Sequence, residues 1–144
     1  MCMARKIRLR DATNVAVAGP HSSRALMNDS PPVQAADFDA LLELLDEQTM
    51  RDVVALFVAS APTRLDSARD GLATGDTARA ATAFHTLRSG CGQLGARHLE
   101  ELCATGERQA KHGDVAAAGE RLREVLVEYD RCLQWFRTHG WLRV

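Results

Sequence analysis

His85 and Arg88, one helical turn apart, are the residues of this 144-residue chain best suited to chemistry. An imidazole is partly neutral near neutral pH, and the neutral ring is a nucleophile. At about 100° per residue, the apolar residues of segment 77–96 share one side of a helix: Ala80, Ala83, Phe84, Leu87, Cys91 and Leu94. His85 points away from this stripe. We therefore predict an exposed imidazole with one cation in reach, which suits a transient reaction with another macromolecule.

The side chains predicted to surround His85 are all small, apart from Arg88. They are, in chain order, Ala78, Ala81, Thr82, Ser89 and Gly92. Small residues leave a low, flat helical surface that another protein can approach closely. We therefore predict that Ala81, Thr82, Ser89 and Gly92 belong to a partner-binding surface.

The residues around His85 also form a recognisable motif. The run Phe84-His85-Thr86-Leu87-Arg88-Ser89-Gly90, followed by Gly92-Gln93-Leu94-Gly95-Ala96, resembles the phosphorylation-site motif of histidine-containing phosphotransfer (HPt) domains. The family pattern is roughly Ala-His-x-Leu-Lys-Gly, then a few small residues, Gly-Ala and a leucine-rich helix. Arg88 stands where the family usually has lysine, and Ser89 where it usually has glycine. The resemblance extends, less sharply, from about Asp37 to Phe136.

The resemblance implies a phosphocarrier of two-component phosphorelays rather than an enzyme. His85 would accept a phosphoryl group from a receiver-domain aspartate and later pass it to a second receiver. Arg88 would hydrogen-bond the phosphoryl oxygens and, by like charge, slightly disfavour the imidazolium. The implied partners are the receiver domains of hybrid histidine kinases and response regulators. The receiver would supply Mg²⁺, so no cofactor is expected on this chain.

Two other functions remain open at this point. One is a helical adaptor that binds a signalling partner without phosphorylation, with His85 incidental. The other is a redox or metal sensor that uses Cys91 and Cys103, although their spacing, taken with His98, matches no known zinc pattern. Gly90-x-Gly92-x-x-Gly95 fits GxGxxG but follows a helix rather than a strand, so it does not indicate a nucleotide site.

Length and composition indicate one helical domain. Of the residues 46% are hydrophobic but only 5% aromatic, and the abundant alanine and leucine favour helices. The net charge of −1 gives no reason to expect nucleic-acid binding. No apolar run has the length of a membrane span. The four cysteines include no Cys-x-x-Cys, and we interpret them as reduced thiols of a cytoplasmic protein.

The apolar periodicity predicts the order of the elements. Residues 1–35 lack it and are predicted to be a flexible tail. Asp37 is the predicted N-cap of a short helix, and Thr49 that of a long helix that continues through a kink at Pro62 to Gly75. Leu44 lies off the apolar side of the short helix, where it either packs on another helix or contacts a partner.

Three further helices are expected after Gly75. They span about 77–94, 96–112 and 115–136, with Asp114 as the last N-cap. The predicted fold is all-α, an up-down antiparallel four-helix bundle over residues 36–139, with a short additional N-terminal helix. Residues 140–144 are predicted to be a C-terminal tail that folds back or frays.

Overall fold

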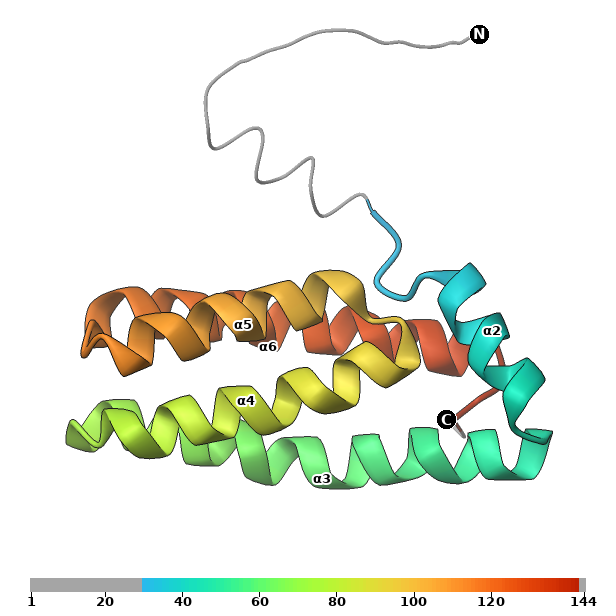
Figure 1. The fold of residues 1–144 in the computed structure, drawn as a ribbon, viewed down its shortest axis with the longest axis horizontal. Coiled ribbons are helices and arrows are strands. Elements are labelled where there is room, and N and C mark those ends of the chain that lie inside the picture. The colour runs from blue at the N-terminus through green and yellow to red at the C-terminus, as the bar shows by residue number, and fades with distance from the viewer. Residues whose placement is uncertain (1–29, 143–144) are drawn as a thin grey trace, which may run out of the picture. The chain divides into compact units, whose positions relative to one another are not determined.

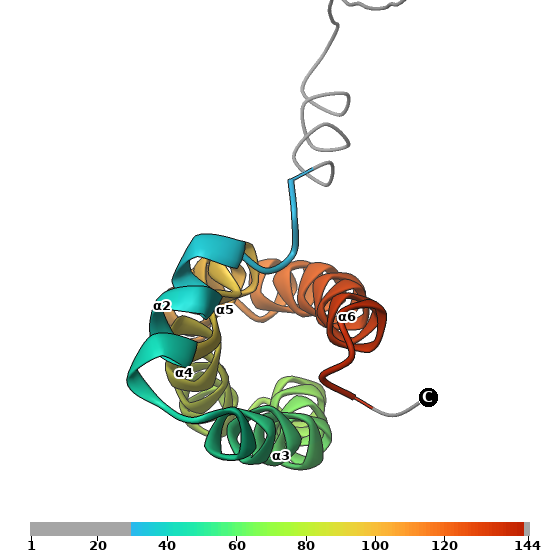
Figure 2. The same cartoon turned by 90° about the vertical axis from the view of Figure 1, so that its right-hand side faces the viewer.

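The structure, a computed structural model, describes residues 30–142, and this part of the chain contains five helices and no strand. The helices are α2 (Ala35–Leu44), α3 (Glu47–Thr74), α4 (Thr77–Leu94), α5 (Arg97–Lys111) and α6 (Val115–Thr138). Each of α3 to α6 packs against the next, and α6 returns to α3 (Figure 1). The end-on view in Figure 2 shows these four helices closing a bundle, with α2 across one end. The predicted all-α bundle is confirmed.

Short turns with a fixed chemistry reverse the chain between the long helices. Gly75 ends α3 and Gly95 ends α4, both with a positive φ that favours glycine. At Gly95 the space is also limited, since an added Cβ would lie 3.1 Å from the carbonyl oxygen of Gln34. The side chains of Asp76 and Asp114 accept hydrogen bonds from backbone N–H groups in the first turns of α4 and α6.

The first two helices each begin about one turn earlier than predicted. Asp37 is not the N-cap of α2, because the helix starts at Ala35 and Asp37 lies in its first turn. There it forms an ion pair with Arg97 of α5. Thr49 is not the N-cap of α3, because the Asp46 carboxylate accepts the Thr49 N–H at 2.7 Å and caps the helix in its place. A free N–H three residues after a carboxylate makes Asp46 the better cap.

Helix α3 runs without a break through Pro62, as predicted. A proline has no N–H, so the carbonyl of Val58, four residues earlier, loses its helical donor. The hydroxyl of Tyr129 on α6 donates to this carbonyl, with 3.4 Å between the oxygens. The hydroxyl of Ser60 donates to the carbonyl of Leu56 within the same helix. A tertiary contact therefore supports α3 at the point where one of its own backbone hydrogen bonds is missing.

The close packing of α4 on α5 decides which residues meet at the surface. Phe84 is fully buried, and its ring lies directly against Gly106 of α5. A Cβ on Gly106 would be 2.7 Å from a ring carbon of Phe84, which is closer than side-chain carbons approach. Only glycine therefore allows the two helices to come this near. The residues that follow each of them, His85 and Glu107, are brought together as a result.

The N-terminal boundary of the bundle differs from the prediction. The compact unit begins at Pro32, and Val33 is fully buried in the core. The N–H of Gln34 donates to the carbonyl of Gly95 at 2.8 Å. The prediction that residues 1–35 lie outside the bundle is therefore wrong for 32–35, where one valine outside any helical period fills a core position. The predicted flexibility of the rest of the tail concerns mainly residues 1–29, which lie outside the described residues.

The segment after α6 folds back onto the bundle. The Trp141 N–H donates to the carbonyl of Phe136 at 2.7 Å, and its ring centroid lies 5.0 Å from that of Phe38. The guanidinium of Arg51 lies over the same indole, 5.0 Å from its centroid. Of the two predicted fates of the tail, folding back is the one observed for Trp141.

Truncation at two positions is expected to show which N-terminal residues belong to the core. A chain that begins at residue 32 should keep the free energy of unfolding of the full chain. A chain that begins at residue 36 should lose about 1.5–3 kcal/mol, the contribution of a fully buried aliphatic side chain. Denaturant unfolding of the two chains measures the difference. Equal free energies of unfolding would show that Val33 adds nothing to the core.

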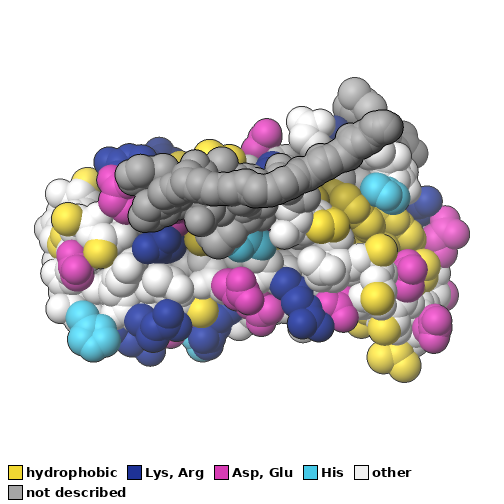
Figure 3. All heavy atoms as spheres, turned by 90° about the horizontal axis from the view of Figure 1, so that it is seen from above, with side chains coloured by type: hydrophobic (Ala, Val, Ile, Leu, Met, Phe, Trp, Pro, Cys, Tyr) yellow, Lys and Arg dark blue, Asp and Glu magenta, His cyan; other side chains and the backbone are white. Residues whose placement is uncertain are grey.

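The surface of the described residues carries charges of both signs. On the face shown in Figure 3, acidic and basic side chains are interspersed, and hydrophobic side chains gather toward the end that α2 covers. Helix α2 ends at Leu44, whose side chain is 82% exposed. None of the described helices is both long and apolar enough to cross a membrane.

Candidate functional site

His85 lies on the exposed side of α4, as its position opposite the apolar stripe predicts. Its side chain is 55% exposed, whereas the six stripe residues are buried. Arg88 follows one turn later, and its Nη2 atom lies 3.3 Å from Nδ1 of His85. The predicted pair is therefore assembled by α4 alone, through the spacing of three residues.

Glu107 of α5 completes the site, and the sequence analysis missed it. Its side chain is only 8% exposed, and its Oε2 atom lies 3.2 Å from Nδ1 of His85. The same oxygen lies 3.0 Å from Nζ of Lys111, and Oε1 lies 3.6 Å from Nη1 of Arg88. One buried carboxylate thus holds three basic side chains in a single cluster.

A signal for Glu107 was present in the sequence. It comes four residues after Cys103 and three before Ala110, so it falls within the apolar stripe of α5. A carboxylate in such a position is buried, and buried carboxylates require partners. The stripe of α5 alone does not say which helix supplies the partner.

The cluster keeps the Glu107 carboxyl ionised. Burial by itself raises its pKa, but the hydrogen bond from Lys111 and the charges of Arg88, Lys111 and His85 outweigh that effect. The pKa of Glu107 is therefore held below its ordinary value. An ionised carboxylate can only accept hydrogen bonds, which limits what Nδ1 of His85 can do.

The two nitrogens of the His85 ring have different surroundings. The two contacts of the ring within the described residues, to Glu107 and to Arg88, are both made by Nδ1. Within residues 30–142, no hydrogen bond or ion pair engages Nε2. Because the ring as a whole is more than half exposed, Nε2 is the nitrogen available to an incoming reactant.

The surface predicted around His85 is only partly as expected. Thr82, Ser89 and Gly92 are exposed, as predicted. Ala81 is only 5% exposed, so its assignment to the partner-binding surface is wrong. The neighbouring helices bury a wider strip of α4 than the apolar stripe alone indicated. Leu44 does not pack on another helix, so of its two predicted roles only contact with a partner remains.

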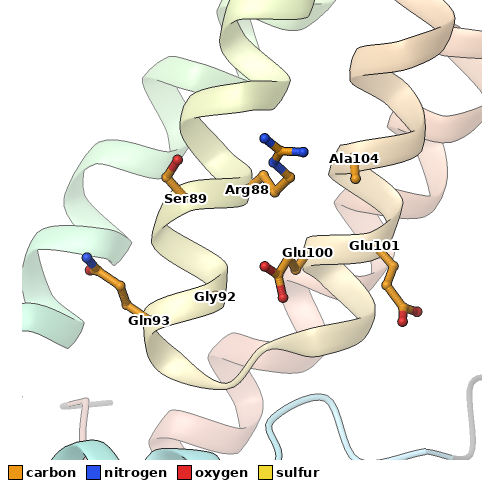
Figure 4. Close-up of a pocket in the computed structure, with 7 residues that line it drawn as sticks. All are labelled: Arg88, Ser89, Gly92, Gln93, Glu100, Glu101 and Ala104. Atoms are coloured by element: carbon orange, nitrogen blue, oxygen red, sulfur yellow. The ribbon is translucent and has the colours of Figure 1, made fainter.

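The surface beyond Arg88 is hollowed rather than flat. A shallow depression of about 650 Å³ lies between α4 and α5, and Figure 4 shows the side chains that line it. Arg88 extends toward α5 on one side of α4, whereas Ser89 and Gln93 point to the other side. The carboxylate of Glu100 leans over Gly92, with an oxygen 2.8 Å from where a Cβ would stand. The absence of a side chain at Gly92 therefore leaves room for the Glu100 carboxylate of the same chain.

An apolar groove lies on the opposite side of α4, against α3. It measures about 190 Å³, and Gly90 opens it above the ring of Phe57. Leu56, on its α3 wall, is 70% exposed. Arg64 lies at the same wall. His85 therefore stands between a charged cluster on the α5 side and an apolar groove on the α3 side.

The three cysteines of the described residues are placed for packing. Cys91, Cys103 and Cys132 are free thiols and fully buried. A hydrogen bond with Cys103, together with burial, raises the pKa of the Cys91 thiol, and burial raises that of Cys132 to about 12. Thiols that stay protonated react slowly, and no group of His, Cys, Asp and Glu within residues 30–142 is arranged to hold a metal ion. No observation therefore favours the sensor hypothesis.

Comparison with known proteins gives the class of protein that this fold and site define. The sequence profile of the Hpt domain matches residues 52–135. The chain therefore belongs to the Hpt domain family, and its role is histidine phosphotransfer in a two-component phosphorelay. The family predicted from the motif around His85 is confirmed.

A solved structure supports the fold. The chain is similar to histidine-containing phosphotransfer protein B (HptB) from Pseudomonas aeruginosa PAO1, with 21% sequence identity and a TM-score of 0.71. The similarity covers 79% of this chain and 99% of that one. At this identity the likeness shows a shared fold. A search among curated proteins gives no match.

Proposed function

We propose that His85 is the residue that carries the phosphoryl group. The observation that supports this most is an exposed ring whose Nδ1 is engaged by Glu107 while Nε2 is open. The matched range contains two other histidines. His98 is mostly buried beside Glu101, and His112 lies at the end of α5 with Nδ1 against a backbone carbonyl. Neither has a buried carboxylate against Nδ1, since Glu101 is 78% exposed and the carbonyl near His112 belongs to Arg108.

The transfer proceeds by attack of Nε2 on the phosphorus atom of a receiver's aspartyl phosphate. The Nε2 lone pair forms the P–N bond, the P–O bond to the aspartate breaks, and its electron pair stays on the aspartate carboxylate. The same steps in reverse pass the group to a second receiver. The receiver supplies Mg²⁺ and the remaining catalytic groups, so this chain acts as a phosphocarrier and needs no cofactor of its own.

The receiver docks on the α3 side of α4. The groove there offers apolar area at Leu87 and Leu94 of α4, and the exposed side chain of Leu56 extends it. Leu44 adds apolar surface at the end of α2. The charged cluster on the other side of His85 has its charges already paired, so it contributes less binding area.

Transfer from a phosphorylated receiver tests the proposal. Incubation with receivers of hybrid kinases or response regulators should label this chain, and the label should be lost in acid but kept in alkali. Peptide mapping should place it on His85. A partner that binds tightly but transfers no phosphate would favour the adaptor hypothesis. The cytoplasmic location of the chain remains a prediction.

Arg88→Ala is expected to slow transfer and to shorten the life of the phosphorylated protein. A charge-assisted hydrogen bond to a phosphoryl oxygen contributes about 1.5–3 kcal/mol. Arg88 is 38% exposed, which reduces that to about 1.4 kcal/mol, or roughly tenfold in rate. Time courses of labelling and of label decay measure both effects. Unchanged kinetics would mean that Arg88 does not contact the phosphoryl group and serves only in the ion-pair cluster with Glu107.

A further inference from the structure

The surface on the α3 side of His85 contains an exposed arginine at a junction of two hollows. Arg64 of α3 lines the apolar groove together with Thr86, the residue that follows His85 on α4. A depression of about 360 Å³, also between α3 and α4, continues this surface toward the start of α4. Arg64 and Thr86 line the depression as well as the groove. The guanidinium therefore lies where the two hollows meet.

The local sequence explains why Arg64 has no partner on its own helix. Arg51 and Arg69, the other arginines of α3, form ion pairs with carboxylates four and three residues before them. The positions three and four residues from Arg64, in both directions, hold only alanine and serine. Within residues 30–142, no hydrogen bond or ion pair engages the Arg64 guanidinium. It is therefore free to take a partner from another molecule.

The neighbouring cations of the site are already paired. Arg79, which also lines the depression, lies 3.7 Å from the carboxylate of Asp70. Arg88, on the α5 side, shares the Glu107 carboxylate. A new ion pair with a partner protein competes with such internal pairs, whereas at Arg64 it displaces only water. Of these three arginines, Arg64 is the one that gains most from an anion on a docked protein.

We propose that Arg64 is a specificity-determining residue of the docking surface, which selects receivers that place an Asp or Glu carboxylate over the junction of the two hollows. The inference rests on the proposed docking of the receiver on the α3 side of α4. Apolar contact in the groove is non-directional, so it distinguishes poorly between receivers. A guanidinium adds a directed contact that a suitably placed carboxylate satisfies. A receiver with lysine or arginine at that place is repelled.

The role of Arg64 differs from that of Arg88. Arg88 lies on the helix of His85, with its Nη2 atom 3.3 Å from the ring, so it reaches the group that is transferred. Arg64 lies on the neighbouring helix and lines two hollows that His85 does not line. Arg64 therefore contacts the flank of the docked receiver. Its replacement should change the affinity for receivers and leave the reactivity of the imidazole unchanged.

Charge reversal at Arg64 tests this role. With the phosphorylated receiver that labels the wild-type chain fastest, Arg64→Glu should lower kcat/KM roughly tenfold or more, mainly through KM. The decrease should shrink at high salt, because ions screen exposed charges. Arg64→Gln removes the charge without reversing it and should be intermediate. Phosphoramidate, a small donor that needs no docking surface, should label His85 at equal rates in all three proteins.

Arg137→Glu is the matched control for the change in net charge. Arg137 is exposed on α6 and lines neither hollow. This variant should accept phosphate from the receiver as the wild type does. An equal loss in Arg64→Glu and Arg137→Glu would mean that only the net charge of the chain matters, and it would overturn the proposal.

A charge exchange identifies the carboxylate on the receiver. Each exposed Asp and Glu outside the receiver's phosphorylation pocket is changed in turn to Lys. One of these receiver variants should transfer poorly to the wild-type chain and about tenfold better to Arg64→Glu, since residues in contact are energetically coupled. If no receiver variant recovers transfer to Arg64→Glu, the predicted contact does not exist.

The remaining outcomes separate this inference from the proposed function. Equal kcat/KM for the wild type and Arg64→Glu would show that Arg64 takes no part in docking. Slower labelling of Arg64→Glu by phosphoramidate would place Arg64 at the phosphoryl group or in the support of the fold, against the proposal. Failure of both receivers and phosphoramidate to label the wild-type chain at His85 would overturn the proposed function and the inference with it, whereas the other outcomes concern Arg64 alone.

Discussion

His85→Gln is expected to abolish phosphate acceptance and to leave the fold intact. Glutamine has no ring nitrogen to attack phosphorus, and neither of the other histidines of the matched range has the surroundings of His85. No label above background should appear from receivers or from phosphoramidate. Gel autoradiography under alkaline conditions measures this, with Arg88→Ala as a partly active comparison.

The stability of the same variant is an independent check on the structure. His85 is 55% exposed, and Glu107 keeps Lys111 as a partner when the imidazole is removed. The free energy of unfolding should therefore change by less than about 1 kcal/mol. A larger loss in denaturant unfolding would mean that the imidazole supports the buried carboxylate more than its exposure indicates. Labelling of the variant at another histidine would mean that His85 is not the phosphorylated residue.

Ser89→Trp is expected to block transfer from a receiver while leaving the reactivity of His85 toward a small donor. Ser89 is exposed one turn after His85, and its hydroxyl donates to the His85 carbonyl at 3.2 Å. It points to the α3 side of the helix, where we place the receiver (Figure 4). An indole there would hold the two proteins apart, and about 1 Å of misplacement can cost about 100-fold in rate.

Two donors and a control variant separate docking from damage. Phosphoramidate should label Ser89→Trp at nearly the wild-type rate, whereas a phosphorylated receiver should not. Ala116→Trp adds the same indole at an exposed position on α6 and should behave as wild type with both donors. If Ser89→Trp retains transfer from the receiver, the receiver docks elsewhere. If it loses both activities, the substitution has disturbed the site itself.

The sequence was sufficient for features that depend on neighbours along one helix. The apolar period of segment 77–96 places His85 outward and Arg88 one turn away, because both relations follow from 3.6 residues per turn. The same period predicts the order of the helices and the all-α fold. Gly75 and Asp114 act where their local chemistry indicates, since a positive φ and an N-cap are properties of a few adjacent residues.

The tertiary structure decided everything that depends on two helices at once. Val33 has no periodic pattern, and its burial depends on a core position that several helices create together. Ala81 is buried because neighbouring helices cover more of α4 than its apolar stripe indicates. The carbonyl left open by Pro62 finds the hydroxyl of Tyr129, which lies far along the chain.

The site follows the same division. Arg88 was predictable, since it lies on the helix of His85. Glu107 was visible as a polar residue within an apolar stripe, but its partner depends on how closely α5 approaches α4. That approach is set by the contact of Phe84 with Gly106, which no single-helix pattern contains. The sequence by itself thus predicted the reactive histidine, whereas the packing of two helices decided which of its nitrogens is engaged, because a carboxylate from the second helix lies 3.2 Å from Nδ1.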